Sequence, residues 1–293
     1  MTHMDWIRTL GPGPISPGDR MGSLSYVDDS ARARAASAIK TGRTVSLARE
    51  LVPGESLRKD SSPAFSVEFF YTEEPVGTWA GPGAGTGTDH LRLDCHGIGV
   101  THMDALRHTA IDHTFYGGID VDDPDASSTW EQRDGVFTRA FYIDFPALRG
   151  TPWVEIDEPV TGREIEAAIS GTGLSLERGD ALALNMGRHN WEAAGHPMSS
   201  LRRPGLGEDA AHWLSTQPVS MICWDFLDVK NGCDAVAAVH LLNWAQGLIL
   251  VDNCTFAEAC EVLPGPVCVV AVIVLPLPIR GATGCAVNPL LIV

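Results

Sequence analysis

The chain of 293 residues has no long hydrophobic run and no excess of basic residues. Its longest apolar run, from Val267 to Leu275, ends at Pro276. A membrane-spanning helix needs about 20 apolar residues, so this run predicts a buried strand. Lys and Arg number 21 against 37 Asp and Glu, and the resulting net charge of −16 disfavours binding to nucleic acid or to anionic membranes. We therefore expect a small-molecule substrate, with no nucleic acid and no membrane as partner.

The seven cysteines are odd in number and include no Cys-x-x-Cys pair. This pattern disfavours a disulfide framework and a zinc finger, and it predicts reduced thiols. The residues that follow Met1 lack the apolar stretch of a secretory signal. We therefore expect a cytoplasmic protein.

The composition, with 44% hydrophobic and 20% charged residues, is that of an ordinary globular protein. Helical and strand patterns alternate along the chain, which predicts an α/β fold. We expect one domain over residues 61–293 and an N-terminal extension over residues 1–60, formed by an extended arm (1–25) and a helix. The expected helices are 28–41, 161–171, 209–214, 239–245 and 256–260; the expected strands are 44–47, 181–186, 219–224, 248–251, 267–275 and 286–292; and loops are expected over 52–63 and 72–88.

Five of the ten histidines lie between His90 and His113. If residues 96–104 form a strand, His96, His102 and Asp104 share one face, because alternate side chains point the same way. Imidazole and carboxylate ligands suit Zn²⁺, Mn²⁺ or Fe²⁺. The alternative is that the carboxylate simply orients a structural histidine, while His90 and His113 are exposed polar residues.

A second pair of polar residues consists of His240, in or just before a helix, and Asp252, at the end of the following strand. A helix and a strand joined by a tight glycine turn run side by side, so their polar ends can converge. The alternative is a histidine at a helix cap and an aspartate before a turn.

The segment from Val100 to His108, with its His102-x-Asp104-x-x-x-His108 pattern, resembles the central motif of the family of putative cyclases, which includes bacterial kynurenine formamidase and isatin hydrolase. The resemblance extends over roughly residues 18–293. Further matching segments are Asp19–Leu24, Thr41–Leu47, Tyr116–Gly118, Gly135–Ala140, Gly179–Leu182, Arg203–Leu206 and Gly281–Gly284.

The resemblance implies a compact α/β domain around a β-barrel-like mixed sheet with flanking helices, assembled as a homodimer or homotetramer. It implies a divalent metal ion, Zn or Mn, with His102 and Asp104 as ligands and His108 as general base and acid. His240 and Asp252 stand where dinuclear members carry a His and a Glu ligand. Ile98 stands where shorter members carry a ligand histidine, and His96 would replace it.

A divalent metal ion and a histidine general base suit hydrolysis of a small cyclic or aryl amide, a lactam, a formamide or a lactone by activated water. The same parts could instead serve a non-hydrolytic cyclase, dehydratase or isomerase of secondary metabolism, and a catalytically silent binding protein is a third alternative. For substrate binding we expect Phe70 and Trp79 in an aromatic lid and Arg188 as a partner for a carboxylate. Aromatic residues in the core or an interface, and a surface arginine, are the alternatives.

Overall fold

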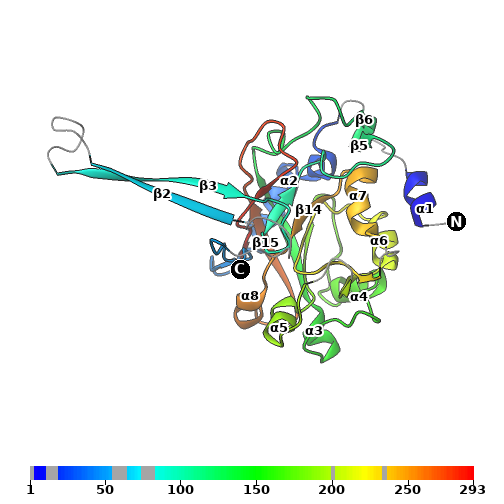
Figure 1. Cartoon of the computed structure of the whole chain (residues 1–293). Helices are drawn as coiled ribbons and strands as arrows, with labels where there is room; N and C mark the ends of the chain where they lie inside the picture. Colours follow the sequence, from blue (N-terminus) through cyan, green and yellow to red (C-terminus); the bar gives the residue numbers. More distant parts are fainter. Residues whose placement is uncertain (1–2, 11–18, 55–64, 74–82, 199–201, 233–235) are drawn as a thin grey trace. The chain divides into compact units, whose positions relative to one another are not determined.

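The structure is a computed structural model, and it describes residues 3–10, 19–54, 65–73, 83–198, 202–232 and 236–293 (Figure 1). Contacts divide the chain into two units. Unit 1 comprises Met1–Arg49 and Thr101–Val293, and unit 2 comprises Glu50–Val100. The division into residues 1–60 and 61–293 stays a prediction.

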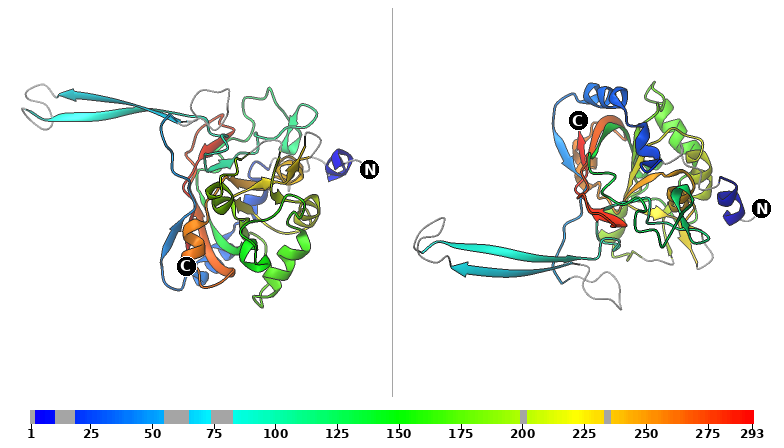
Figure 2. Two further views of the ribbon diagram at one scale, coloured as in Figure 1. Left: turned by 60° about the horizontal axis from the view of Figure 1, so that its bottom comes forward. Right: turned by 90° about the horizontal axis from the view of Figure 1, so that it is seen from above.

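Unit 1 is built on a curled nine-stranded mixed sheet, visible in both views of Figure 2. The strand order is β1-β17-β15-β7-β8-β11-β14-β4-β16. Strands β7, β8, β11 and β14 pair in parallel at the centre, and the outer pairs are antiparallel. The bounds are β1 Thr44–Ser46, β4 His102–Asp104, β7 Val136–Asp144, β8 Ala181–Asn185, β11 Met221–Trp224, β14 Ile249–Asp252, β15 Val267–Val274, β16 Gly284–Ala286 and β17 Leu290–Ile292.

The central parallel strands are apolar along their length because both faces of the sheet are covered. Neighbouring residues of one strand, such as Leu182 and Ala183, belong to two different hydrophobic clusters. One face packs on α1 (His3–Leu10), α4 (Gly162–Ser170), α6 (Glu208–Leu214) and α7 (Ala238–Gln246). The other cluster includes residues of α2 (Asp29–Ala38) and α8 (Ala257–Val262). The predicted α/β fold around a barrel-like mixed sheet with flanking helices is therefore confirmed.

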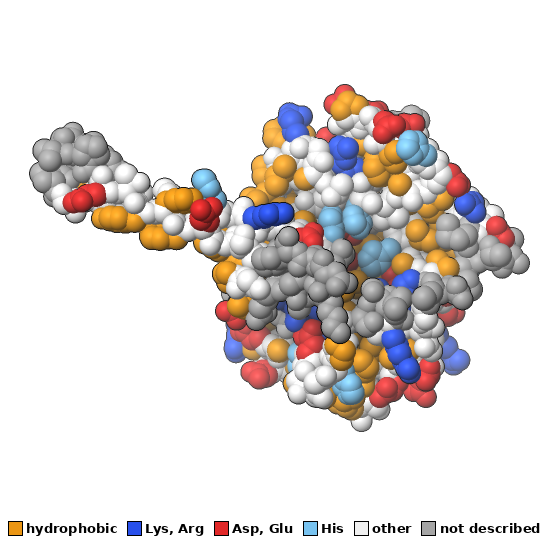
Figure 3. Space-filling view, viewed as in Figure 1, with side chains coloured by type: hydrophobic (Ala, Val, Ile, Leu, Met, Phe, Trp, Pro, Cys, Tyr) orange, Lys and Arg blue, Asp and Glu red, His pale blue; other side chains and the backbone are white. Residues whose placement is uncertain are grey.

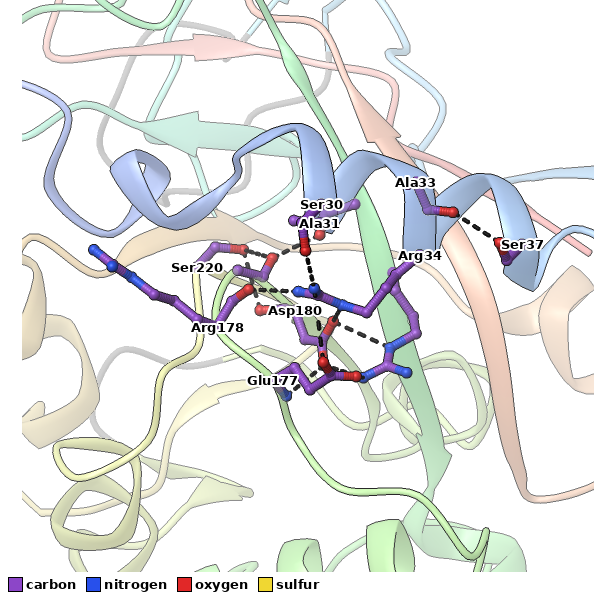
Figure 4. A network of polar contacts seen from close by, with 12 residues as sticks. Ser30, Ala31, Ala33, Arg34, Ser37, Glu177, Arg178, Asp180 and Ser220 are labelled. Carbon is purple, nitrogen blue, oxygen red and sulfur yellow. Dashed lines mark hydrogen bonds and ion pairs between the residues drawn. The ribbon is translucent and has the colours of Figure 1, made fainter.

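Helix α2 is tied to the sheet through Asp180, the residue before β8 (Figure 4). The Asp180 carboxylate is fully buried and accepts two hydrogen bonds from Arg139 of β7, at 2.6 and 3.1 Å. The Arg34 guanidinium of α2 lies 3.6 Å from the same carboxylate and donates to the Arg178 carbonyl. One buried carboxylate therefore joins α2, β7 and the start of β8.

Most predicted elements are confirmed, with shifts of one to three residues at their ends. The predicted capping box is present: the Thr161 side chain accepts from Glu164 N, and Glu164 accepts from Thr161 N. Gly247 ends α7 with a positive φ of 67°, as a glycine stop requires.

Two predictions for unit 1 are wrong. The N-terminal arm over residues 1–25 contains α1 and a 3₁₀ helix, η1 (Gly22–Tyr26), because Ile7 packs into the core and Ser23 bonds to the Gly247 carbonyl. The strand predicted over 286–292 is two strands, β16 and β17, which pair with different neighbours in the sheet. The remaining elements of unit 1 are β5 Thr114–Phe115, η2 Tyr116–Gly118, β6 Ile119–Asp120, α3 Phe145–Arg149, α5 Arg188–Ala193, β9 Arg202–Arg203, β10 Gly205–Leu206, β12 Leu227–Asp228 and β13 Lys230–Asn231.

Unit 2 contains a long hairpin made of β2 (Phe65–Glu73) and β3 (Gly85–Leu93). The loop predicted over residues 72–88 is therefore wrong at both its ends, where the chain is in strands. Gly85 and Gly87 made this segment look like a loop, yet they pair with Glu73 and Tyr71 across the hairpin, and the rings of Tyr71 and Phe69 lie over them. Figure 3 shows hydrophobic side chains along this hairpin.

No helix among the described residues is long and apolar enough to cross a membrane.

Candidate metal centre

The candidate site begins at the carboxyl end of β14, where β4 pairs with it antiparallel. Asp252, the last residue of β14, lies directly opposite His102, the first residue of β4. Directly opposed residues share a face of the sheet, and so do residues two apart in one strand. His102 Nε2 accordingly lies 3.4 Å from an oxygen of Asp104 and 3.9 Å from Asp252 Oδ2. All three side chains are buried.

Helix α7 brings His240 to the same place. Its Nε2 lies 3.0 Å from Asp252 Oδ2, and its Nδ1 is hydrogen-bonded to Asp228. One ligand atom from each of Asp104, His240 and Asp252 fits within 4.8 Å of the others. The structure therefore brings together the two polar pairs that the sequence suggested separately.

Two residues that sequence reasoning missed hold these side chains in place. Asp228 accepts from Val239 N in the first turn of α7 and from His240, so one carboxylate fixes both the helix start and the imidazole. Trp224 donates its indole N–H to Asp252 Oδ1 at 2.5 Å. Trp224 is the last residue of the predicted buried strand over 219–224, and Asp228 follows that strand. Ligand-binding residues commonly lie at the carboxyl ends of parallel strands, and this position could have identified both residues from the sequence.

The site is rich in carboxylates, and this sets its electrostatics. Burial alone would lower the pKa of His240, but Asp252 and Asp228 on its two sides raise that pKa well above its ordinary value. Burial lowers the pKa of Arg203, while the same two aspartates oppose the change. Histidine nitrogens and carboxylate oxygens together fit a divalent metal ion.

His108 lies beyond the end of β4, at the close of a turn in which its N–H donates to the Ala105 carbonyl. Its Nε2 is 3.8 Å from Asp104 Oδ2, and its side chain is 30% exposed. Among these residues, His108 thus combines proximity to the carboxylates with access to solvent.

The expectation that residues 96–104 form one strand is wrong, because only His102–Asp104 is a strand. The preceding segment turns twice: Gly97 N bonds to the Asp94 carbonyl and Val100 N to the Gly97 carbonyl. His96 lies in this segment, within unit 2, and is half-buried. Its role as a ligand stays a prediction.

Of the three residues expected to bind substrate, the structure describes Phe70 and Arg188. Phe70 lies on β2 of the hairpin, with its ring centroid 4.8 Å from that of His90. Trp79 lies outside the described residues. Arg188, at the start of α5, is almost fully buried, and burial lowers its pKa to about 10. It donates to Glu192, to the Asp225 carbonyl and to Asn253 Oδ1, so protein groups engage its guanidinium.

Comparisons with known proteins were made on the sequence and on the fold. A sequence model of the family described as putative cyclase matches residues 44–231. A search of curated proteins finds no match.

Several solved structures share the fold. A structure described as a novel cyclase superposes with a TM-score of 0.77 at 19% identity, covering 94% of this chain and 97% of the other. An isatin hydrolase bound to the product analogue thioisatinate gives 0.58 at 19% identity, covering 88% and 94%. Isatin hydrolase A from Ralstonia solanacearum gives 0.56 at 16% identity, covering 85% and 91%. At these identities the similarity concerns the fold.

Proposed function

The chain belongs to the putative cyclase family, and on that premise we propose that it is a metal-dependent hydrolase that cleaves the C–N bond of a small cyclic or aryl amide, such as a lactam or formamide, or the ester bond of a lactone. The observation that carries this proposal is the convergence of Asp104, His240 and Asp252 within 4.8 Å beside His102. The similarity of fold to isatin hydrolase, an enzyme named for a cyclic amide, supports the amide class.

The residues that would hold the ion are His102, Asp104, His240 and Asp252, with His96 as a further predicted ligand. An ion held there, Zn²⁺ or Mn²⁺, supplies Lewis-acid polarisation of a carbonyl and lowers the pKa of water toward about 7. Asp228 holds the His240 ring through Nδ1, so that Nε2 is the nitrogen that lies on the side of Asp252.

His108 is the proposed general base and acid. Its imidazole takes the proton of the attacking water and returns it to the leaving nitrogen or oxygen. The nearby Asp104 carboxylate, 3.8 Å from Nε2, stabilises the protonated imidazole between the two transfers. Partial exposure lets the imidazole meet a substrate that enters from solvent.

Metal content tests the site. Mass spectrometry of the protein purified without a metal-affinity tag should find a divalent metal, and the double variant His102→Ala/Asp104→Ala should lose it. No metal in the wild-type protein after reconstitution would overturn the proposal.

The role of His108 is tested by activity on a panel of lactams, formamides and lactones. We expect His108→Ala to lower kcat by about 10²–10⁴-fold, the usual contribution of a general base, with metal content unchanged. His113→Ala is the matched control, because His113 is an exposed histidine outside this site and its loss should leave kcat intact. Undiminished activity in His108→Ala would remove it from the mechanism.

Reaction in ¹⁸O-labelled water distinguishes hydrolysis from cyclisation, dehydration or isomerisation. Hydrolysis places one labelled oxygen in the product acid. A product formed without label would refute a hydrolase and favour the non-hydrolytic alternative.

A further inference from the structure

Three arginines of unit 1 gather around Trp130 in a chain that is otherwise strongly acidic. The Arg280 guanidinium lies over the Trp130 ring, 3.9 Å from its centroid, and the Arg133 guanidinium lies 4.9 Å from the same centroid. Arg107 reaches the segment that follows Arg280, because its Nη1 lies 3.9 Å from the position that a Cβ atom on Gly281 would occupy. We call Arg107, Trp130, Arg133 and Arg280 the arginine cluster.

These guanidinium groups have no carboxylate partner in the part of the chain that the structure describes. Arg133 donates to the Trp130 carbonyl at 3.0 Å, and Arg107 donates at 3.4 Å to two backbone carbonyls within residues 124–126. The Arg107 Nε is buried and finds no acceptor among the described residues. Arg139, by contrast, pairs with a carboxylate at 2.6 Å. The arginine cluster therefore carries positive charge that no described carboxylate neutralises by direct contact.

The acidic residues that neighbour the arginine cluster in sequence are bound to other groups or exposed. Glu131 accepts from the N–H and the hydroxyl of Ser128, at 2.6 and 3.0 Å, and lies 3.8 Å from Arg20. Asp134 is exposed to solvent, where water and salt screen its charge. An anion that approaches the arginine cluster therefore does not have to displace a carboxylate.

Backbone contacts place the arginine cluster beside the candidate metal centre. Arg107 directly precedes His108 in the turn after β4. Gln132, which lies between two members of the cluster in sequence, donates its side-chain amide to the Asp104 carbonyl at 3.3 Å. The Thr283 carbonyl, in the segment after β15, accepts from the N–H that follows Asp104, at 2.9 Å. All three segments that carry the cluster thus meet the chain within a few residues of Asp104.

The chemistry of the arginine cluster suits a carboxylate ligand. A guanidinium is planar and carries its N–H donors at its edge, so an arginine that stacks on an aromatic ring keeps donors available. Two parallel N–H donors of one arginine match the two oxygens of a carboxylate. Because the net charge of −16 repels anions from the surface as a whole, an anionic ligand needs a locally basic site.

We propose that the arginine cluster binds a carboxylate group of the substrate while the amide or ester bond lies at the candidate metal centre. The substrate is then an anionic amide, lactam, formamide or lactone, and the neutral analogue is a poorer substrate. This inference rests on the proposed function for the reaction itself and extends it to the class of substrate. The arginines supply binding and orientation, and His108 acts on the bond that is cleaved.

A matched pair of substrates tests the proposal. For aryl formamides the pair is formanilide and 4-formamidobenzoate, which differ only in the carboxylate. We expect the wild-type protein to show a kcat/KM that is about 10-fold or more higher for the carboxylated compound, as a hydrogen-bonded charge contributes. Arg280→Gln should abolish most of this preference through a higher KM for the carboxylated compound, with metal content unchanged.

Matched controls separate the site from the overall charge of the protein. Arg32→Gln removes the same charge at an exposed arginine of α2 that pairs with Asp29, and it should keep the wild-type preference. Arg280→Lys retains the charge but loses the paired donors, so its KM should lie between those of wild type and Arg280→Gln. Arg133→Gln replaces Arg280→Gln if that variant does not fold, as judged by circular dichroism.

Binding of benzoate tests the site without any reaction, since benzoate has no bond to hydrolyse. Calorimetric titration should show that Arg280→Gln binds benzoate about 10-fold more weakly than wild type and Arg32→Gln do. Benzoate held by the metal ion alone would bind equally to all three proteins and would overturn the proposal.

The two measurements distinguish this inference from the proposed function. A protein that hydrolyses both formamides equally well, or that prefers the neutral one, is a hydrolase without the carboxylate site. If neither formamide is hydrolysed, the benzoate titration alone decides: weaker binding in Arg280→Gln supports the site, and equal binding overturns it.

Discussion

At the residue scale, Asp228 is a positioning residue, because it contacts His240 and the start of α7 together. The variant Asp228→Asn keeps the shape but loses the carboxylate that orients the imidazole. We expect metal affinity to fall by about 10–100-fold, as is usual when a partner of a ligand histidine is changed. A metal titration by calorimetry measures it, with Asp29→Asn, at a fully exposed aspartate, as the control. Equal affinity in the two variants would contradict this role.

Asp180 is the clearest case of a single residue that stabilises the fold. Asp180→Ala removes the buried partner of Arg139, which is itself buried, and leaves the guanidinium without its main counter-charge. Loss of one member of a buried pair costs about 3–5 kcal/mol, and urea unfolding should show a loss of that size.

Glu177→Ala is the control for Asp180, since its carboxylate contacts the same Arg139 nitrogen from an exposed position. An exposed pair contributes about 0–1 kcal/mol. Similar losses in both variants would show that burial does not decide the effect.

At the element scale, the start of α4 depends on the capping box and is sensitive to pH. Burial alone would raise the pKa of Glu164, but hydrogen bonds from Thr161 and the nearby Arg149 lower it below the ordinary value. A carboxylate with a lowered folded-state pKa contributes stability above its unfolded pKa, and that contribution is lost as pH falls through the folded pKa.

We therefore expect Glu164→Gln to reduce the free energy of unfolding near neutral pH. The difference from wild type should shrink as pH falls below the ordinary Glu value of 4.5. Urea unfolding at a series of pH values measures both quantities. Glu166→Gln, at an exposed position on the same helix, should show no such trend, and a constant difference for Glu164→Gln would argue against the capping box as its cause.

At the scale of the whole molecule, the candidate metal centre joins β4, β14 and α7, so an ion bound there should stabilise unit 1 against unfolding. An ion that binds only the folded chain adds about 2.7 kcal/mol when its free concentration is 100 times its Kd. Thermal unfolding with added Zn²⁺ or Mn²⁺, and after chelation, measures the shift. His102→Ala/Asp104→Ala should show none, and an equal shift in that variant would place the ion elsewhere.

The sequence predicts a feature when the residues that form it lie close together along the chain. The capping box at Thr161, the glycine stop at Gly247 and the apolar parallel strands were predictable, because each depends on neighbours within a few residues. The His102-x-Asp104 pair was predictable for the same reason. The prediction of one strand over residues 96–104 is wrong because the chain makes two turns at Gly97 and its neighbours. The alternation of side-chain types along this segment gives no indication of those turns.

Residues 72–73 and 85–88 of the hairpin were predicted as loop because β3 is rich in glycine. In the structure, aromatic rings of β2 pack over Gly85 and Gly87, and this contact between strands cannot be read from the local sequence. Asp228 and Trp224 were missed because their roles exist only once α7 packs against the sheet.

The sequence by itself determined the α/β alternation and the residue types that can hold a metal, since backbone preferences and ligand chemistry are local properties. Only the tertiary structure decided which of those residues meet. His102 faces Asp252 through the register of β4 on β14, and His240 reaches them through the docking of α7. Such meetings depend on packing between segments distant in the chain, where side-chain volume and strand register, rather than local pattern, determine position.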